Sequence, residues 1–189
     1  MEQRLGKIKA VIYDFDDLMV NSHPLHIKSW QPVLARYGKN ILDFPKEREK
    51  NTIGKRGIEV SEELINYFNI DTTPKEFYEE KVSIIIELFK KELQLMPGLK
   101  HSLEIFKQNN FRMAIGSSGS MDYINVGLNK FDIKDYFEVF VSAKDVTKGK
   151  PDPEPYLVAA NKLGLRPEEC LVLEDAEKGI ESAKAAGCK

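Results

Sequence analysis

The sequence predicts an α/β fold in which a doubly wound parallel sheet carries an inserted all-helical cap domain. Short apolar runs of strand length, at residues 9–13, 111–115, 137–141 and 170–173, come at the start of the chain and in its second half. In that second half they alternate with helical patterns, whereas residues 20–95 show helical patterns and turns without a convincing strand. We therefore expect a core domain made of residues 1–20 and 96–189 and a cap domain made of residues 21–95.

The first apolar run ends in three carboxylates, Asp14, Asp16 and Asp17. Side chains alternate along a strand, so Asp14 and Asp16 can share one side while Phe15 packs on the other. Two carboxylates this close repel each other. Either one stays ionised as a nucleophile or metal ligand while the other is pushed towards its protonated form, or a cation settles between them. A solvated acidic turn at a strand end is the competing interpretation.

The segment after this acidic turn reads as helix and turn. A cap residue and a proline in Asn21–Pro24 predict a helix start, followed by helical apolar spacing over residues 25–37. Residues 39–57 are polar and broken by Pro45, Gly54 and Gly57, so we expect turns there. Further helices are expected over residues 58–68 and 75–95. An insert that leaves the sheet directly after its first strand would hang over the strand ends and act as a lid.

The second half of the chain alternates between strands and helices. Helices are expected over residues 96–108, 123–131, 154–163 and 176–186, the last closed by Gly187. Each strand in such a sheet brings its carboxyl end to the same edge, where α/β folds bind ligands.

Three polar clusters follow the later strands. Ser117 and Ser118, with nearby glycines, suit a phosphate at a helix N-terminus. Lys150 lies in a loop stiffened by prolines, and Glu174–Asp175 offers hard oxygen ligands for Mg²⁺. Each cluster alone has an ordinary explanation as a turn, a solvated lysine or a favourable helix start. Together with the first acid pair, however, they make a phosphoryl-transfer site.

Composition and charge narrow the class of protein. The 189-residue chain is 42% hydrophobic and 31% charged, with a formal net charge of −2, which gives no basic field for nucleic acid or an anionic membrane. No run of 18 apolar residues occurs, and the first nine residues are charged, unlike a signal peptide. Cys170 and Cys188 lack metal-ligand spacing and are expected as reduced thiols. We expect a cytoplasmic protein that is a monomer or a weak dimer.

These residues resemble the haloacid dehalogenase-like superfamily, in its branch of β-phosphoglucomutases and small-metabolite phosphatases with a helical cap and a Rossmann-like core. The resemblance covers essentially the whole chain and rests on four motifs in the family's order. The motifs are Asp14–Phe15–Asp16, Ser117, Lys150 with Pro151, and Glu174–Asp175 with Gly179–Ile180. Met96–Pro97–Gly98, at the return from cap to core, is also typical of the family.

The resemblance implies a role for each matching residue. Asp14 would attack the substrate phosphorus and form an aspartyl-phosphate, and Asp16 would act as general acid and then as general base. Lys150 and Ser117 would bind phosphate oxygens, with Ser118 beside them. Magnesium is the implied cofactor, and its ligands would be the side chains of Asp14, Glu174 and Asp175 and the backbone carbonyl of Asp16.

The chain departs from the family pattern at several positions. Asp17 stands where the family commonly has Gly, and because Asp tolerates unusual backbone angles the turn is expected to survive. Asn21 and Ala176 stand where Asp and Ser are common, so nearby hydrogen bonds are expected to differ. The family continues beyond the position of Lys189 into another strand, and a shortened chain is one reading of this.

Three functions remain open at the level of the sequence. A phosphatase acting on a small phosphorylated metabolite is preferred, because the stretch around Arg56, a candidate substrate-binding residue, resembles such enzymes. A sugar-phosphate mutase is favoured by His26 and Lys81, which lie where the mutase has a proton-gating histidine and a substrate-binding cap lysine. For His26 the competing interpretation is a helix histidine packed beside Trp30. The third possibility is a non-catalytic module that binds Mg²⁺ and phosphate.

Overall fold

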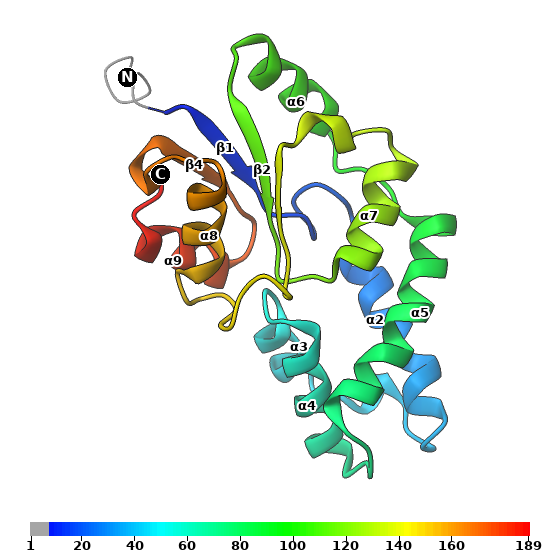
Figure 1. Ribbon diagram of the computed structural model, residues 1–189. Coiled ribbons are helices and arrows are strands. Elements are labelled where there is room, and N and C mark those ends of the chain that lie inside the picture. Colours follow the sequence, from blue (N-terminus) through cyan, green and yellow to red (C-terminus); the bar gives the residue numbers. More distant parts are fainter. Residues whose placement is uncertain (1–7) are drawn as a thin grey trace.

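The computed structural model describes residues 8–189. Residues 1–7, most of the charged segment discussed above, lie outside the described residues. Within them, four strands form one parallel sheet in the order β3-β2-β1-β4 (Figure 1). Their bounds are Ala10–Tyr13 for β1, Arg112–Gly116 for β2, Val139–Val141 for β3 and Cys170–Leu173 for β4. The predicted α/β class with a parallel sheet is confirmed.

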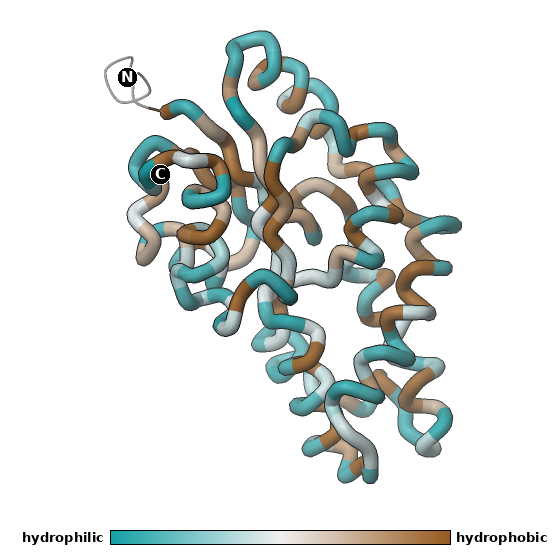
Figure 2. The backbone as a smooth tube through the Cα atoms, viewed as in Figure 1, coloured by the Kyte–Doolittle hydropathy of each residue, from teal (hydrophilic) through white to brown (hydrophobic). Residues whose placement is uncertain are grey.

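Helices cover both faces of the sheet, because alternate strand residues point to opposite sides. Val11 and Tyr13 of β1 belong to one buried cluster, which also holds Phe15. Ala10 and Ile12 belong to a second cluster on the other face. The apolar residues in Figure 2 accordingly concentrate on the strands and on the inward sides of the helices. Phe15 therefore packs away from the acidic edge, as the alternation predicted.

The helices fall into two groups along the chain. Between β1 and β2 lie α2 (His23–Ala35), α3 (Lys46–Thr52), α4 (Gly57–Phe68), α5 (Pro74–Glu92) and α6 (Leu99–Gln108). After β2 come α7 (Met121–Lys130), α8 (Glu154–Lys162) and α9 (Glu177–Ala186), with short 3-10 turns at Ile41–Asp43, Lys134–Tyr136 and Pro167–Glu169. In Figure 1, α3 and α4 lie beyond the carboxyl ends of the strands, and α2 and α5 lie beside these two helices.

The helices α2, α4 and α5 enclose a buried cluster of their own. Its centre includes Trp30, which stacks on Phe77 with ring centroids 5.6 Å apart. The carboxyl half of α5 is different, because Ile85 and Phe89 belong to the cluster under the sheet. This helix therefore ties the helical insert to the sheet.

Two chain crossings connect the sheet with the helical insert, and they lie side by side. Val20 pairs with Leu95 in an antiparallel bridge, and the Asn21 N–H donates to the Gln94 carbonyl at 2.9 Å. The Met96 N–H donates to the carbonyl of Met19 at the same distance. The outgoing and returning segments thus hold each other in register.

The sequence-based boundaries were wrong in several places. Helix α6 begins at Leu99, three residues after the expected start at residue 96. Residues 46–52, expected as turns, form α3, a helix that buries no residue and so shows no apolar periodicity. Helix α5 ends at Glu92, three residues before the expected end. Strand β3 begins at Val139, because Phe137 follows a 3-10 turn rather than joining the ladder.

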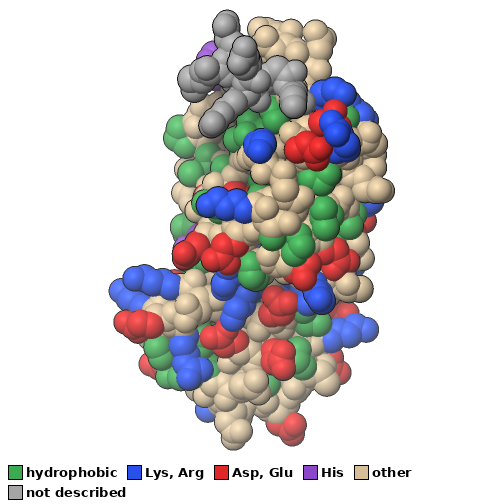
Figure 3. All heavy atoms as spheres, turned by 90° about the vertical axis from the view of Figure 1, so that its left-hand side faces the viewer, with side chains coloured by type: hydrophobic (Ala, Val, Ile, Leu, Met, Phe, Trp, Pro, Cys, Tyr) green, Lys and Arg blue, Asp and Glu red, His purple; other side chains and the backbone are tan. Residues whose placement is uncertain are grey.

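The surface and the cysteines agree with the composition. Lys, Arg, Asp and Glu side chains are interspersed on the face drawn in Figure 3. Cys170 and Cys188 are buried free thiols. Across residues 8–189, the structure contains no helix with both the length and the apolar character that a bilayer crossing needs.

Candidate active site

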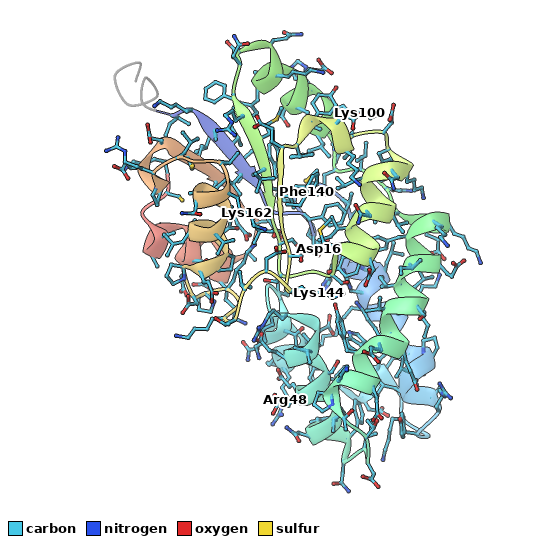
Figure 4. The ribbon with its side chains drawn as sticks, in the orientation of Figure 1. Asp16, Arg48, Lys100, Phe140, Lys144 and Lys162 are labelled. Atoms are coloured by element: carbon cyan, nitrogen blue, oxygen red, sulfur yellow. The ribbon has the colours of Figure 1, made fainter. Side chains whose placement is uncertain are left out.

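The polar clusters predicted at the strand ends meet in one cavity at the carboxyl edge of the sheet. Asp14 and Asp16 follow β1, Ser117 and Ser118 follow β2, and Glu174 and Asp175 follow β4, while Lys150 reaches in from the loop before α8. All of these line the cavity, together with His26, Lys81, Lys55 and Tyr123 from the helices and their connections. Figure 4 shows Asp16 at the junction of the sheet and the helices.

Lys150 is the central cation of the site. Its Nζ donates to Asp14 Oδ1 at 2.6 Å and also to Glu174 Oε1. The lysine is 4% exposed and Asp14 is 7% exposed, so this contact is shielded from water. Glu174 receives two further hydrogen bonds, from the Tyr156 hydroxyl at 2.7 Å and from the Ala176 N–H at 3.1 Å. Tyr156 was not among the predicted site residues; the sequence predicted only that it lies on a helix over residues 154–163.

Loss of hydration and mutual repulsion make it costly to keep the carboxylates of the site ionised. Loss of hydration raises the pKa of Asp14 well above its usual value, although the ammonium of Lys150 opposes this. Burial and the neighbouring Glu174 likewise raise the pKa of Asp175 to about 6. Oxygen atoms of Asp14, Glu174 and Asp175 lie within 4.8 Å of one another. Three crowded carboxylates with a single lysine are a donor set that suits a divalent cation such as Mg²⁺.

Asp16 is oriented separately from this acidic group. Its Oδ1 lies 2.9 Å from His26 Nε2, and its Oδ2 accepts a hydrogen bond from the Tyr123 hydroxyl at 3.1 Å. Burial alone would raise the pKa of Asp16, but the contacts with His26 lower it below its usual value. Asp16 therefore rests as a carboxylate, while Asp14 contacts Lys150. Tyr123 was not predicted from the sequence either. A tyrosine on an amphipathic helix has no sequence signal that distinguishes a site residue from a core residue.

His26 connects Asp16 to the buried Lys81. The Lys81 Nζ lies 2.6 Å from His26 Nδ1. When the Lys81 amine is protonated it can only donate, and in that state Nδ1 accepts and Nε2 carries the proton that is shared with Asp16. Around the amine stand the rings of Trp30 and Tyr123, with centroids 5.3 and 5.5 Å away. His26 thus lies in the cavity rather than serving only as packing beside Trp30.

Replacing Lys81 by Met is expected to stabilise the protein at neutral pH. Burial lowers the pKa of Lys81 from 10.5 to about 7, so the unfolded chain binds the additional proton between pH 7 and pH 10.5. The stability of the native protein should therefore rise with pH across this window. In Lys81→Met that rise should be smaller, and the melting temperature at pH 7 should be higher by a few degrees, ~3 °C. Thermal unfolding at pH 7 and pH 9.5 measures both effects, and equal slopes in the two proteins would contradict the assignment.

In the loop after β2, the hydroxyl groups of two serines form hydrogen bonds with nearby backbone groups. Ser117 is 1% exposed, and its Oγ accepts a hydrogen bond from the Gly119 N–H at 2.9 Å. The Ser118 hydroxyl donates to the Gly54 carbonyl at 3.0 Å, which ties the loop to the connection between α3 and α4. Both serines line the cavity near the start of α7, a position that suits an anion.

The structure does not bring Arg56 into this cavity. Its guanidinium pairs with Glu59 at 2.7 Å and donates to the Thr147 carbonyl at 2.9 Å. The neighbouring Lys55 lines the cavity instead, with its Nζ 2.9 Å from Glu63. Arg56 therefore links the helical insert to the loop that carries Lys150.

Comparisons with known proteins agree with this fold. A family model described as haloacid dehalogenase-like hydrolase matches residues 11–189. The chain is 32% identical to a phosphorylated carbohydrates phosphatase of Thermotoga maritima, over 95% of this chain and 82% of that protein. It is 30% identical to hexitol phosphatase B of Escherichia coli, over 95% of this chain and 81% of the relative.

Two solved structures share the architecture. CbbY from Rhodobacter sphaeroides, solved in complex with phosphate, superposes with a TM-score of 0.84 at 22% identity, and covers 96% of this chain and 84% of its own. A β-phosphoglucomutase from Clostridium difficile has a TM-score of 0.83 at 25% identity, over 96% and 82% of the two chains.

The fold, the cavity and the named relatives together define a phosphomonoester hydrolase. The chain belongs to the haloacid dehalogenase-like hydrolase family.

Proposed function

We propose that the protein is a Mg²⁺-dependent phosphatase of a small phosphorylated carbohydrate that works through an aspartyl-phosphate. The observation that carries the proposal is the buried pair of Asp14 and Lys150 at the sheet edge, with Asp16 held apart from it by His26 and Tyr123. The similarity to a phosphorylated carbohydrates phosphatase and to a hexitol phosphatase supports the choice of substrate class.

The two carboxylates divide the reaction. A carboxylate oxygen of Asp14 attacks the phosphorus, and the bond from phosphorus to the ester oxygen breaks. Asp16 gives its proton to the leaving alcohol and, as a carboxylate, then takes a proton from the water that attacks the phospho-Asp14. That second attack releases phosphate and regenerates Asp14. A bound phosphate dianion would raise the pKa of the nearby Asp16, which favours the protonated form that the first step needs.

The remaining side chains bind and shield the phosphoryl group. Lys150 and Ser117 would contact its oxygens, with Ser118 at the mouth of the same loop. The side chains of Asp14, Glu174 and Asp175 and the backbone carbonyl of Asp16 would hold Mg²⁺, which when bound offsets the repulsion between the nucleophile and the phosphate. We assign residues 21–95 as the cap domain, whose His26, Lys55 and Lys81 face the substrate and whose closure excludes water.

The mutase alternative has one specific observation in its favour. His26 contacts Asp16 directly, which is the arrangement that a histidine gating proton transfer requires. The shared fold with a β-phosphoglucomutase is compatible with it.

A metal-dependence assay with a substrate panel is expected to show phosphate release from a sugar or sugar-alcohol phosphate. Chelation of divalent ions should reduce the release at least ~100-fold, and added Mg²⁺ should restore it. Nucleoside monophosphates form the comparison class. Conversion of β-glucose 1-phosphate into glucose 6-phosphate without release would establish the mutase instead. Binding of phosphate and Mg²⁺ without any turnover across the panel would establish the non-catalytic module.

A further inference from the structure

The third carboxylate of the acidic stretch, Asp17, occupies a special backbone position. Its φ is +60°, in the left-handed region that favours glycine and that Asp tolerates better than most residues. The Asp17 N–H donates to the Val20 carbonyl at 2.9 Å, which closes a tight turn directly after Asp16. This turn aims the Asp17 side chain at the beginning of α2.

The Asp17 carboxylate caps that helix from outside. Its Oδ1 accepts hydrogen bonds from the backbone N–H of Ser22 at 3.0 Å and of His23 at 2.8 Å. The next residue, Pro24, has no N–H, and the N–H of Leu25 already donates to the Ser22 carbonyl at 2.9 Å. One carboxylate oxygen therefore satisfies the donors that the start of α2 leaves open, and its negative charge lies at the positive end of the helix.

The capped turn carries the histidine that contacts Asp16. The His26 N–H donates to the Ser22 carbonyl at 2.9 Å, so His26 lies one helical turn beyond the two capped N–H groups. Its Nε2 then returns to Asp16 Oδ1, the residue directly before Asp17. The first turn of α2 is thus held by two carboxylates: Asp17 binds its backbone and Asp16 binds the His26 side chain. If this turn frayed, His26 would move away from Asp16.

We propose that Asp17 is a positioning residue that fixes His26 against Asp16 by capping α2. The role rests on the proposed function of Asp16 as acid and base. Asp17 also lines the cavity, but in this role it acts through its hydrogen bonds to the backbone of Ser22 and His23. The carboxylate that replaces the family's usual glycine would then stabilise the first turn of α2.

Three variants separate this role from general stability. Asp17→Gly suits the positive φ and removes both capping bonds, whereas Asp17→Asn keeps an Oδ1 acceptor. Thr73→Ala is the matched control, because the Thr73 Oγ1 caps α5 by accepting from the Glu76 N–H at 3.2 Å, and Thr73 does not line the cavity. Asp17→Gly and Thr73→Ala should each lower the melting temperature by a few degrees, ~3 °C.

The kinetic expectations differ between these variants. Asp17→Gly should lower kcat about tenfold with a KM change below about twofold, because a displaced histidine affects the proton step more than binding. Asp17→Asn should keep kcat within about threefold of the native value, and Thr73→Ala should leave it unchanged. In a His26→Ala background, Asp17→Gly should have no further effect on kcat, since the residue acts through His26.

A second measurement does not depend on turnover. In the ¹⁵N-labelled full chain, the His26 ring nitrogens should change resonance position in Asp17→Gly and keep it in Asp17→Asn and Thr73→Ala. An unchanged His26 signal in Asp17→Gly overturns the proposal, and so does an equal loss of kcat in the presence and absence of His26. If no phosphate ester is turned over, the proposed function fails while the nuclear magnetic resonance result still decides the role of Asp17.

Discussion

Replacing Asp14 by Asn is expected to reduce phosphate release by a factor of about 10⁴ or more. The amide has nearly the shape of the carboxylate but cannot serve as the attacking nucleophile. Asp14 is one of the two carboxylates that contact the buried Lys150, and its Oδ1 lies 2.6 Å from the Nζ atom. Its substitution removes the attacking group and leaves the cavity otherwise lined as before. Phosphate release on the best substrate of the panel measures the effect.

The stability of Asp14→Asn distinguishes a chemical role from a structural one. Burial raises the pKa of Asp14, so the ionised side chain is costly to fold, and Glu174 remains as a partner for Lys150 in the variant. We therefore expect a melting temperature within ~3 °C of the native protein when both are measured with chelator. Asp135→Asn, at an exposed carboxylate, serves as the control with unchanged activity. Residual activity above about one per cent in Asp14→Asn would contradict the aspartyl-phosphate route.

The architecture could be predicted because its signals are local and periodic. Apolar runs such as residues 170–173 end abruptly in polar residues, and parallel strands bring those ends to one edge. Asp14, Ser117, Lys150 and Glu174 were therefore expected to meet, although they lie up to 160 residues apart, and all four line one cavity in the structure. Periodicity failed at α3, where a helix without a buried face leaves no apolar pattern.

The groups that orient the site could not be found from the sequence. Tyr123 and Tyr156 lie on helices that pack on the sheet, and only the packing turns their hydroxyl groups towards Asp16 and Glu174. Arg56 illustrates the converse, because a basic residue in a promising stretch pairs with Glu59 instead of lining the cavity. From the sequence, Asp17 was only a carboxylate in place of the family's usual glycine. The structure shows that it accepts hydrogen bonds from the backbone at the start of α2. Such roles depend on contacts across the fold, which spacing along the chain does not encode.

Replacing Lys150 by Met is expected to lower both activity and stability. Lys150 contacts two buried carboxylates, so its loss leaves Asp14 and Glu174 facing each other without a counter-charge. Removal of one partner from a buried ion pair costs ~3–5 kcal/mol of unfolding free energy. Activity should fall by about 10³-fold, because the charge that would stabilise the transferring phosphoryl group is lost. Chemical denaturation with chelator and steady-state phosphate release measure the two losses.

A second substitution shows whether the two losses have separate causes. In Lys150→Met with Glu174→Gln, one of the two opposed charges is gone, so roughly half of the lost stability should return, while activity should not. The single variant should also regain stability as the pH falls from 8 towards 5. Burial raises the pKa of Asp14, the ammonium that opposes this rise is gone, and protonation of Asp14 removes the repulsion. Lys162→Met, at the half-exposed partner of Asp145 (Figure 4), is the matched control and should change stability by less than ~1 kcal/mol. If the double variant recovers no stability, repulsion between the two carboxylates is not the cause, and Lys150 stabilises the fold through its packing on Tyr156, whose ring centroid lies 5.0 Å from the amine.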